Sequence, residues 1–323
     1  MISSATRFIN GGVSVVIPTY QREQVLLDTV NAVAQLVGPL REILLIDQTP
    51  LHDPETILEL NRLQNEGLIR WIRFEKPSIP HAMNVGLKAA ENELVLFLDD
   101  DIIPDPQLIE AHAAAHSSDD VRAVVGQVLQ PEQRAEDVVT PPRRRGLCAD
   151  FDFPFNSMRP ASLANVMAGN LSVKRSAALA SGGFDENFVG VAYRFETEFA
   201  RRLLMHGGTI EFCPQASIRH LRAERGGTRS TGSHLTSAAP KHGVGDYYFA
   251  MRCGETWLER LAYMSRRPIR EVATKFHLRH PWYIPVKLLG EFRALCWAIQ
   301  LQLRGPALIR ALTAESPQET PSP

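Results

Sequence analysis

Three consecutive carboxylates, Asp99, Asp100 and Asp101, carry the strongest chemical signal in the sequence. They come directly after an apolar run at residues 94–98, which is typical of a buried strand. Carboxylates this close together repel one another and need a compensating cation, and their oxygens suit a hard ion such as Mg²⁺ or Mn²⁺. Such an ion commonly bridges to substrate phosphates and neutralises a leaving group. The alternative is a solvated acidic turn that caps the next helix.

The elements that must position these acids alternate between strand and helix patterns through the first half of the chain. Strands are predicted at residues 13–17, 42–46, 68–74 and 94–98, with helices at 23–36, 58–66 and 81–91. Continuous apolar strands separated by helices predict an α/β fold with a mainly parallel sheet covered on both faces. Ligands of such sheets bind beyond the carboxyl ends of the strands. The three aspartates fall at that edge, so we favour the metal site over the acidic turn.

The second half of the chain has a less regular pattern. It predicts a strand at 123–129, a long loop at 131–160, a further element at 165–173, a helix at 194–206, and short strands at 209–213 and 217–221. Residues 222–244 are polar and rich in turn formers, which indicates a mobile loop. We therefore expect an α/β domain over 10–245, a helical extension over 246–312 and a disordered tail over 313–323.

The composition excludes several classes of protein. The chain has 323 residues, of which 44% are hydrophobic and 22% charged, as is ordinary for soluble globular proteins. Its formal net charge of -1 argues against a dedicated nucleic-acid binder. The four cysteines are far apart and form no CxxC pair, which indicates reduced thiols in a cytosolic protein. The N-terminus lacks the apolar stretch of a signal peptide, and residues 282–303 carry too many charges for a comfortable membrane span.

Asp47 follows the second predicted strand and is a candidate nucleotide contact. An acid at this place often accepts hydrogen bonds from a ribose or a base, but an Asx-turn over residues 48–50 explains it equally well. The chain has neither GxGxxG after the first strand nor GxxxxGK[ST]. A nucleotide would therefore not be held in the dehydrogenase or P-loop manner.

An ordered set of motifs resembles the family 2 glycosyltransferases with the GT-A fold. The motifs lie at residues 13–22, 45–47, 80–86, 97–101, 169–172, 182–186 and 196–198, and at His220. The resemblance covers roughly residues 12–230. It implies inverting transfer of a sugar from a nucleotide-diphosphate donor to a hydroxyl of a glycan or lipid-linked acceptor, assisted by Mg²⁺ or Mn²⁺.

The resemblance also implies roles for individual residues. The donor contacts on this basis are Thr19, Tyr20, Asp47, Asn84, Asp99, Asp100 and Asn170. Asp99 and Asp101 match the outer acids of a DxD element, with Asp101 as the direct metal ligand. His220 would be a second metal ligand or a diphosphate contact. Met83 stands where many relatives carry Arg, so one donor contact is expected to be absent.

Two glutamates compete for the role of general base. Glu196 and Glu198 are two residues apart on the predicted helix, so their side chains point in very different directions. Glu198 has arginines three and four places further on, the spacing of a surface ion pair worth about 0.2–0.5 kcal/mol. Glu196 has no cation at these spacings. Phe195-Glu196 stands where the family often has Glu-Asp, so the resemblance implies that the base is Glu196, a Glu with one extra methylene.

Two basic regions remain. Arg222, Arg225 and Arg229 lie in the predicted loop after His220, and a basic loop suits a lid that closes over a diphosphate. Between residues 260 and 279 cations outnumber acids and aromatic side chains are interleaved, which favours a packed helical extension. The alternative is peripheral attachment at the inner face of an anionic membrane that carries a lipid-linked acceptor.

Two other functions compete with glycosyl transfer. A nucleotidyltransferase would use the acid cluster for two-metal chemistry, but residues 21–23 are a poor version of the basic, glycine-containing signature that it needs after the first strand. The other is a non-catalytic protein that binds a nucleotide sugar or acts as a membrane adaptor.

Overall fold

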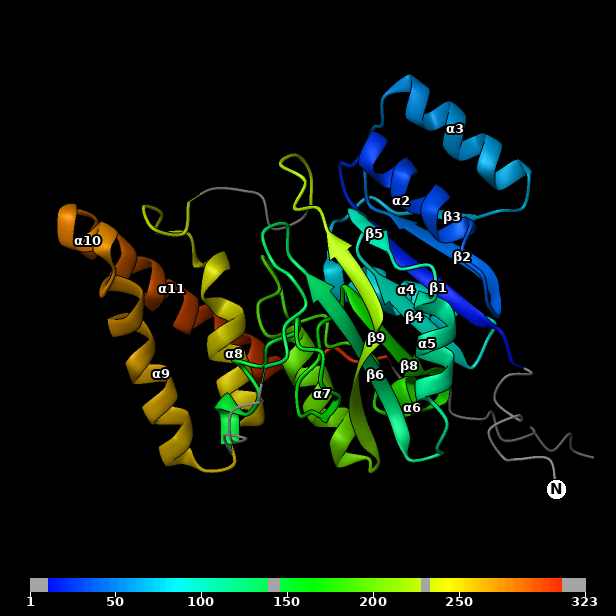
Figure 1. The fold of residues 1–323 in the computed structure, drawn as a ribbon. Helices are drawn as coiled ribbons and strands as arrows, with labels where there is room; N and C mark the ends of the chain where they lie inside the picture. Colours follow the sequence, from blue (N-terminus) through cyan, green and yellow to red (C-terminus); the bar gives the residue numbers. More distant parts are fainter. Residues whose placement is uncertain (1–10, 139–145, 228–232, 310–323) are drawn as a thin grey trace, which may run out of the picture.

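The computed structural model describes residues 11–138, 146–227 and 233–309 (Figure 1). Its strands are β1 (Val13–Thr19), β2 (Leu40–Asp47), β3 (Arg70–Arg73), β4 (Leu94–Leu98), β5 (Ile102–Pro104), β6 (Val121–Leu129), β7 (Ala161–Ser162), β8 (Asn170–Lys174) and β9 (Thr209–His220). Its α-helices are α2 (Gln24–Ala34), α3 (Pro54–Asn65), α4 (Ile79–Ala89), α5 (Leu108–Ala115), α6 (Arg175–Ala180), α7 (Phe195–Met205), α8 (Val244–Cys253), α9 (Trp257–Val272), α10 (Lys275–Arg279) and α11 (Tyr283–Arg304). Helices α8 to α11 gather at one end of the sheet.

One mixed sheet forms the centre of the molecule. Its strand order is β3-β2-β1-β4-β8-β6-β9-β5, with β7 paired to β9. The strands β3, β2, β1 and β4 are parallel, as the alternating pattern predicts, which confirms the α/β fold class. Strand β8 runs antiparallel to both β4 and β6, and β5 antiparallel to β9. An apolar run does not show in which direction its strand is paired, so the sequence predicts more parallel strand pairs than the sheet contains.

The continuous apolar strands are explained by burial on both faces of the sheet. Along β1, Val13, Val15 and Ile17 belong to one hydrophobic cluster, which also holds α2, α3 and α5. Val16 points the opposite way, into a second cluster with α4, α7, α8 and α11. Successive strand side chains alternate between faces, so both faces need apolar residues when both are covered.

Some local expectations are corrected. The short strands predicted at 209–213 and 217–221 are one strand, β9, which keeps its pairing with β6 through a register shift next to Gly126. The element expected at 165–173 is β8, which begins at Asn170. Helix α5 and strand β5 are not predicted by the apolar pattern, because α5 is short and alanine-rich and β5 has only three residues.

The helices after β9 share the core of the sheet. Tyr247, Tyr248 and Phe249 of α8 and Ala298 of α11 are fully buried in the cluster that contains α4 and α7. The expected boundary at residue 245 falls inside α8, and the predicted tail lies outside the described residues. Within the described part of the chain, no helix combines the length and apolar content needed to cross a bilayer.

Candidate active site

A pocket of about 440 Å³ lies at the carboxyl ends of β1 and β4. Residues 18–20 and 97–101 line one part of it, and residues 167–169, Glu196 and His220 line another. Its volume is in the usual range for small-molecule sites, about 300–1,000 Å³. The pocket therefore lies at the edge of the sheet where the alternating strands and helices predict a ligand site.

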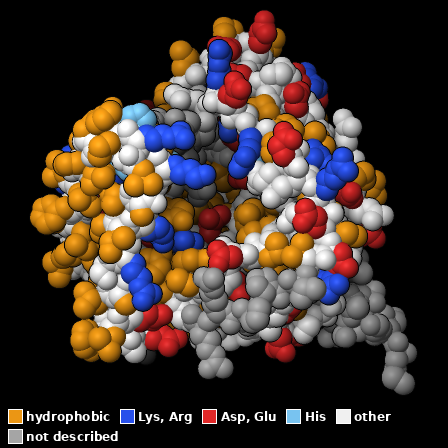
Figure 2. Space-filling model, turned by 60° about the vertical axis from the view of Figure 1, so that its left-hand side comes forward, with side chains coloured by type: hydrophobic (Ala, Val, Ile, Leu, Met, Phe, Trp, Pro, Cys, Tyr) orange, Lys and Arg blue, Asp and Glu red, His pale blue; other side chains and the backbone are white. Residues whose placement is uncertain are grey.

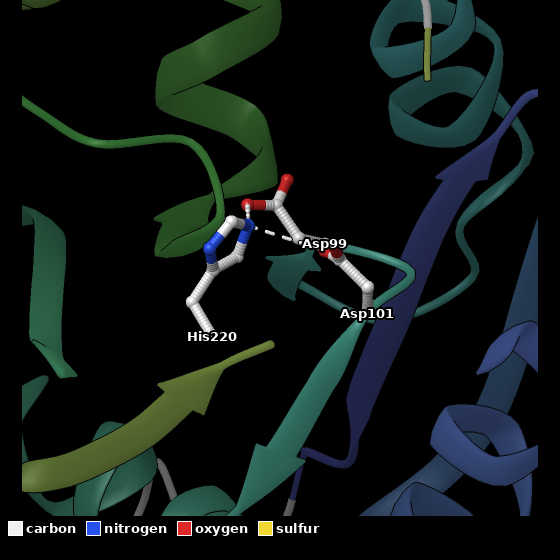
Figure 3. A group of neighbouring side chains, drawn as sticks. All are labelled: Asp99, Asp101 and His220. Atoms are coloured by element: carbon white, nitrogen blue, oxygen red, sulfur yellow. Dashed lines mark ion pairs between the residues drawn. The ribbon is translucent and has the colours of Figure 1, made fainter. Parts of the chain in front are cut away.

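Asp99, Asp101 and His220 meet at this pocket (Figure 3). Their ligand atoms lie within 4.8 Å of one another. His220 Nε2 is 3.2 Å from Asp101 Oδ1 and 3.7 Å from Asp99 Oδ2. Two carboxylates and an imidazole are a donor set that Mn²⁺ and similar divalent ions accept, so these residues fit such an ion.

The short strand β5 brings His220 to the two acids. It pairs antiparallel with the end of β9, and Ile102 lies opposite His220 in this ladder. The residue before Ile102 is Asp101, so the pairing sets the imidazole beside the carboxylate.

The electrostatic surroundings keep Asp101 ionised. Burial by itself raises the pKa of Asp101, but hydrogen bonds from His220 and the backbone N–H of Ala223, and the charge of Arg22, outweigh it and hold the pKa below its usual value. The hydrogen bond to Asp101 in turn raises the pKa of His220. An ionised carboxylate is what a divalent ion requires of its ligand, and the ion would displace the proton from His220.

Asp100 has a different role from its two neighbours. Its Oδ2 accepts a hydrogen bond of 2.7 Å from Thr19 Oγ1, and its Oδ1 lies 3.3 Å from Arg22 Nε. Burial raises the pKa of Asp100 to about 7. The carboxylate of Asp100 thus ties the end of β1 to the acid cluster, while Asp99 and Asp101 turn toward His220.

Arg22 is a site residue that the sequence analysis missed. Its Nη2 lies 3.2 Å from Asp101 Oδ2, and its Nη1 donates to the backbone carbonyls of Ala223, at 3.0 Å, and of Arg225. It therefore links the acid cluster to the chain after β9. An arginine placed just after β1, at the edge where three acids gather, was the available signal.

The first residues after β9 pack closely on residues 20–22. Gly227 donates its N–H to the carbonyl of Tyr20 at 2.8 Å. Gly226 has φ of +80°, and a Cβ there would lie 2.1 Å from the carbonyl oxygen of Gln21, so a side chain has no room. Gly226 and Gly227 thus line the pocket beside Arg22. Arg229, the expected diphosphate contact, lies outside the described residues.

Glu196 lines the pocket at the first turn of α7. Its Oε1 accepts a hydrogen bond of 2.8 Å from the backbone N–H of Ala168. Gly169, the residue after Ala168, packs against Asp99, and a Cβ added to Gly169 would lie 2.2 Å from Asp99 Oδ2. One short segment therefore contacts both the proposed base and a metal-site acid.

Glu198 is not part of a surface ion pair, and that expectation is wrong. It is 1% exposed and faces the core, where its Oε1 lies 2.6 Å from Arg202 Nε. Burial raises the pKa of Glu198 despite the hydrogen bonds and charge of Arg202. Arg202 also donates to the carbonyls of Ser181 and Gly183. The two glutamates of α7 thus point in different directions, one to the pocket and one to the core.

Asp47 does not reach the pocket. It is fully buried, with its Oδ2 2.9 Å from both His52 Nε2 and Trp71 Nε1 and its Oδ1 2.8 Å from the N–H of Thr49. Burial alone raises the pKa of Asp47, but the hydrogen bonds of His52, Thr49 and Trp71 outweigh it and lower the pKa. These donors and the burial correct the assignment of Asp47 as a direct nucleoside contact. Its neighbour Gln48 lines the pocket instead.

Asn84 and Asn170 are also structural, which corrects their assignment to the donor. Asn84 exchanges two hydrogen bonds of 2.8 Å with the backbone of Phe184 and donates to Glu186 at 2.9 Å. Asn170 is fully buried and donates to the carbonyls of Gln127 and Ala216, where the register of β6 and β9 shifts. At these points the side-chain amides bind backbone groups that would otherwise need a backbone partner.

The helical extension holds the start of α7. Arg194, which precedes Phe195 and Glu196, has φ of 71°, and its Nε lies 3.2 Å from Asp246 Oδ1 of α8. Asp246 is fully buried and also binds Tyr263, Arg267 and Arg270. Burial alone raises the pKa of Asp246, but these cations and Tyr263 outweigh it and lower the pKa.

We expect Asp246→Asn to reduce the free energy of unfolding by about 3–5 kcal/mol, because it removes a fully buried carboxylate that pairs with the buried Arg267 and also binds Arg194 and Arg270. Chemical denaturation measures this. Asp137→Asn is the matched control, because Asp137 forms an exposed pair with Arg159 and its loss should change the unfolding free energy little. Equal effects of the two substitutions would contradict the role of Asp246.

Solved glycosyltransferase structures share this fold. S. aureus TarS 1–349 in complex with UDP-GlcNAc has 16% identity and a TM-score of 0.61, over 90% of this chain and 81% of that one. The mannosyltransferase PcManGT from Pyrobaculum calidifontis, in complex with GDP-Man and Mn²⁺, has 18% identity and a TM-score of 0.52, over 93% and 84%. GalNAc-T7 with UDP, GalNAc and Mn²⁺ has 17% identity and a TM-score of 0.56, over 69% and 45%. These likenesses establish the GT-A fold, although the chain spans less than half of GalNAc-T7.

The sequence itself shows the family. The family model described as Glycosyl transferase family 2 matches residues 14–178, just over half of the chain. The protein therefore belongs to glycosyl transferase family 2, as the ordered motifs indicate. No curated protein matches the chain.

Proposed function

We propose that the protein is a metal-dependent, inverting glycosyltransferase that moves a sugar from a nucleotide-diphosphate sugar to a hydroxyl of a glycan or lipid-linked acceptor. The observation that carries this proposal is the meeting of Asp99, Asp101 and His220 in a pocket that Glu196 also lines. Family membership and the UDP-GlcNAc, GDP-Man and Mn²⁺ of the structurally similar proteins support it.

The donor end of the pocket is the side of β1 and β4. Asp101 and His220, with Asp99, would hold Mg²⁺ or Mn²⁺, which neutralises the charge that develops on a departing diphosphate. Thr19 and Tyr20 line the same side and are proposed to contact the nucleoside. Arg22 keeps Asp101 oriented through its ion pair.

The acceptor end is the side of Glu196. Its carboxylate takes the proton of the acceptor hydroxyl as that oxygen attacks the anomeric carbon from the face opposite the diphosphate. The bond from the anomeric carbon to the diphosphate oxygen breaks, and its electron pair leaves with the nucleoside diphosphate. Attack from the opposite face inverts the configuration. The N–H of Ala168 orients the carboxylate through Oε1.

A thermal-unfolding panel tests donor binding. We expect nucleoside diphosphates with Mn²⁺ to raise the unfolding midpoint, because a ligand at a hundred times its Kd adds about 2.7 kcal/mol of stability. The same nucleotides with a chelator should give a much smaller shift. If nucleoside triphosphates stabilise most and pyrophosphate is released, the protein is a nucleotidyltransferase. If no nucleotide responds to Mn²⁺, the proposal fails.

A further inference from the structure

Helix α9 exposes apolar side chains along one side. Trp257, Leu258, Leu261 and Ile269 are 69%, 59%, 55% and 67% exposed. At about 100° per residue, their positions fall within an arc of about 120° around the helix axis. This arc contacts nothing in the described chain that would cover it, while the opposite side of α9 holds the buried Arg267.

Helix α11 repeats this arrangement. Leu288, Leu289, Phe292, Ile299 and Leu303 are 41%, 52%, 64%, 42% and 82% exposed. Their positions fall within an arc of about 100°. The side of α11 that holds Ala294, Ala298 and Leu301 packs into the core.

Leu278 and Trp282, at 80% and 64% exposure, continue the exposed apolar surface between the two helices. We call these exposed side chains of α9, α10 and α11, together with Trp282, the apolar face of the extension. Figure 2, which turns this end of the molecule toward the viewer, shows hydrophobic side chains gathered over it with Lys and Arg side chains beside them. A contiguous exposed apolar surface of this kind marks an interaction site.

The acids of this segment are turned inward. Glu271 and Glu291 bind the buried Arg267 and Lys287, with Glu291 Oε2 2.8 Å from Arg267 Nε and Glu271 Oε2 3.1 Å from Lys287 Nζ. Glu259 accepts the N–H of Leu147 at 2.8 Å. None of the exposed residues between 257 and 304 is acidic.

The exposed charges of the segment are all positive. They belong to Arg266, Arg270, Lys275, Arg279, Arg293 and Arg304. At about 100° per residue around the helix axis, Arg293 and Arg304 lie next to the apolar arc of α11, and Arg266 lies next to that of α9. A second copy of the same face would bring cations against cations, so charge complementarity points to an anionic partner surface.

We propose that the apolar face of the extension docks on the surface of an anionic lipid bilayer. Amphipathic helices with tryptophan and leucine on one side and Lys or Arg beside them lie in the interface, with the apolar side chains at the boundary of headgroups and acyl chains. Trp257 and Trp282 are placed at opposite ends of the α9–α10 segment, and indole rings favour that boundary. The cations attract anionic headgroups.

Docking of this kind would hold the pocket near membrane-borne acceptors. It goes beyond the proposed function and does not depend on it, because vesicle binding is measured without donor or acceptor. Failure of docking therefore leaves the transferase proposal intact, and the reverse also holds.

Co-sedimentation with vesicles tests the proposal. We expect the full chain to bind vesicles that contain phosphatidylglycerol at low salt, to bind pure phosphatidylcholine vesicles far less, and to be released by high salt. No binding to the anionic vesicles at low salt would overturn the proposal, and so would equal binding to both kinds of vesicle.

Single substitutions locate the contact. Leu258→Glu on α9 and Phe292→Glu on α11 should each weaken vesicle binding at least about tenfold, because they place a carboxylate against the headgroups. Leu58→Glu is the matched control, since Leu58 is 73% exposed on α3, and it should bind as the wild type does. All three positions are solvent-facing, so unchanged unfolding midpoints are expected. The assignment of this face to lipid is wrong if Leu58→Glu weakens vesicle binding as much as Leu258→Glu and Phe292→Glu do. It is also wrong if Leu258→Glu and Phe292→Glu abolish self-association of the protein and leave vesicle binding unchanged.

Discussion

Glu196→Gln is expected to lower kcat for sugar transfer by about 10²–10⁴-fold, because it removes the proposed general base. Donor affinity should stay unchanged, since Glu196 lies at the proposed acceptor end of the pocket and not among the three residues that could hold the metal. The amide can still accept the hydrogen bond of Ala168, so the fold of the first turn of α7 should persist. Initial rates and donor titration by calorimetry measure the two quantities.

Glu198→Gln is the matched control on the same helix. It should lower the free energy of unfolding by about 3–5 kcal/mol, because it removes a buried carboxylate and leaves Arg202, whose side chain is only 11% exposed, without this counter-charge. The folded fraction should keep its transfer rate. If Glu196→Gln transfers sugar at the wild-type rate while folded Glu198→Gln is inactive, the assignment of the base is wrong. Glu196→Asp keeps the carboxylate and shortens its reach by one methylene, so it should fall between wild type and Glu196→Gln.

Asp101→Asn is expected to weaken Mn²⁺ binding by about 100-fold or more and to remove the Mn²⁺ dependence of nucleotide binding. Asp101 is the acid that the surroundings hold ionised, with a side chain only 3% exposed and its Oδ1 3.2 Å from His220 Nε2. An amide keeps the size of the side chain and loses the charge that the ion requires. Titration of Mn²⁺ followed by electron paramagnetic resonance measures metal binding directly, without any turnover.

Asp100→Asn separates the metal role from general damage to the acid cluster. Asp100 is bound by Thr19 and Arg22 and turns away from His220, so its substitution should reduce stability while Mn²⁺ still binds. Unchanged Mn²⁺ affinity and unchanged metal dependence in Asp101→Asn would remove Asp101 from the metal site. Equal loss of Mn²⁺ in both variants would show that the cluster acts as a whole.

Local patterns in the sequence are sufficient to predict the scaffold of the site. Residues 13–17 and 94–98 are apolar at every position except Ser14, as a strand buried on both faces requires, so both strands are correctly predicted. Three acids after such a strand identify the edge of the sheet at which the pocket lies. These inferences depend only on neighbours in sequence, and burial on both faces leaves little choice of residue.

Direction of side chains and pairing of distant segments lie beyond such patterns. Asp47, Asn84 and Asn170 occupy motif positions, yet each side chain is turned into the protein. Asn84 and Asn170 are held there by partners distant in sequence, and Asp47 by His52 and Trp71. Glu198 carries the spacing of a surface pair, but its side of α7 faces the core. A helical spacing states which residues are neighbours on a helix and not which side meets solvent.

By itself the sequence determined the α/β scaffold, the acid cluster at its carboxyl edge and the family, because these depend on local apolar runs and ordered motifs. Only the tertiary structure decided which acids meet His220, since that depends on the pairing of β5 with the end of β9. It also decided that Arg22 joins the acids to the chain after β9, and that the acids of the extension face inward. Each of these contacts joins segments far apart along the chain, and their energies depend on burial that no single segment encodes.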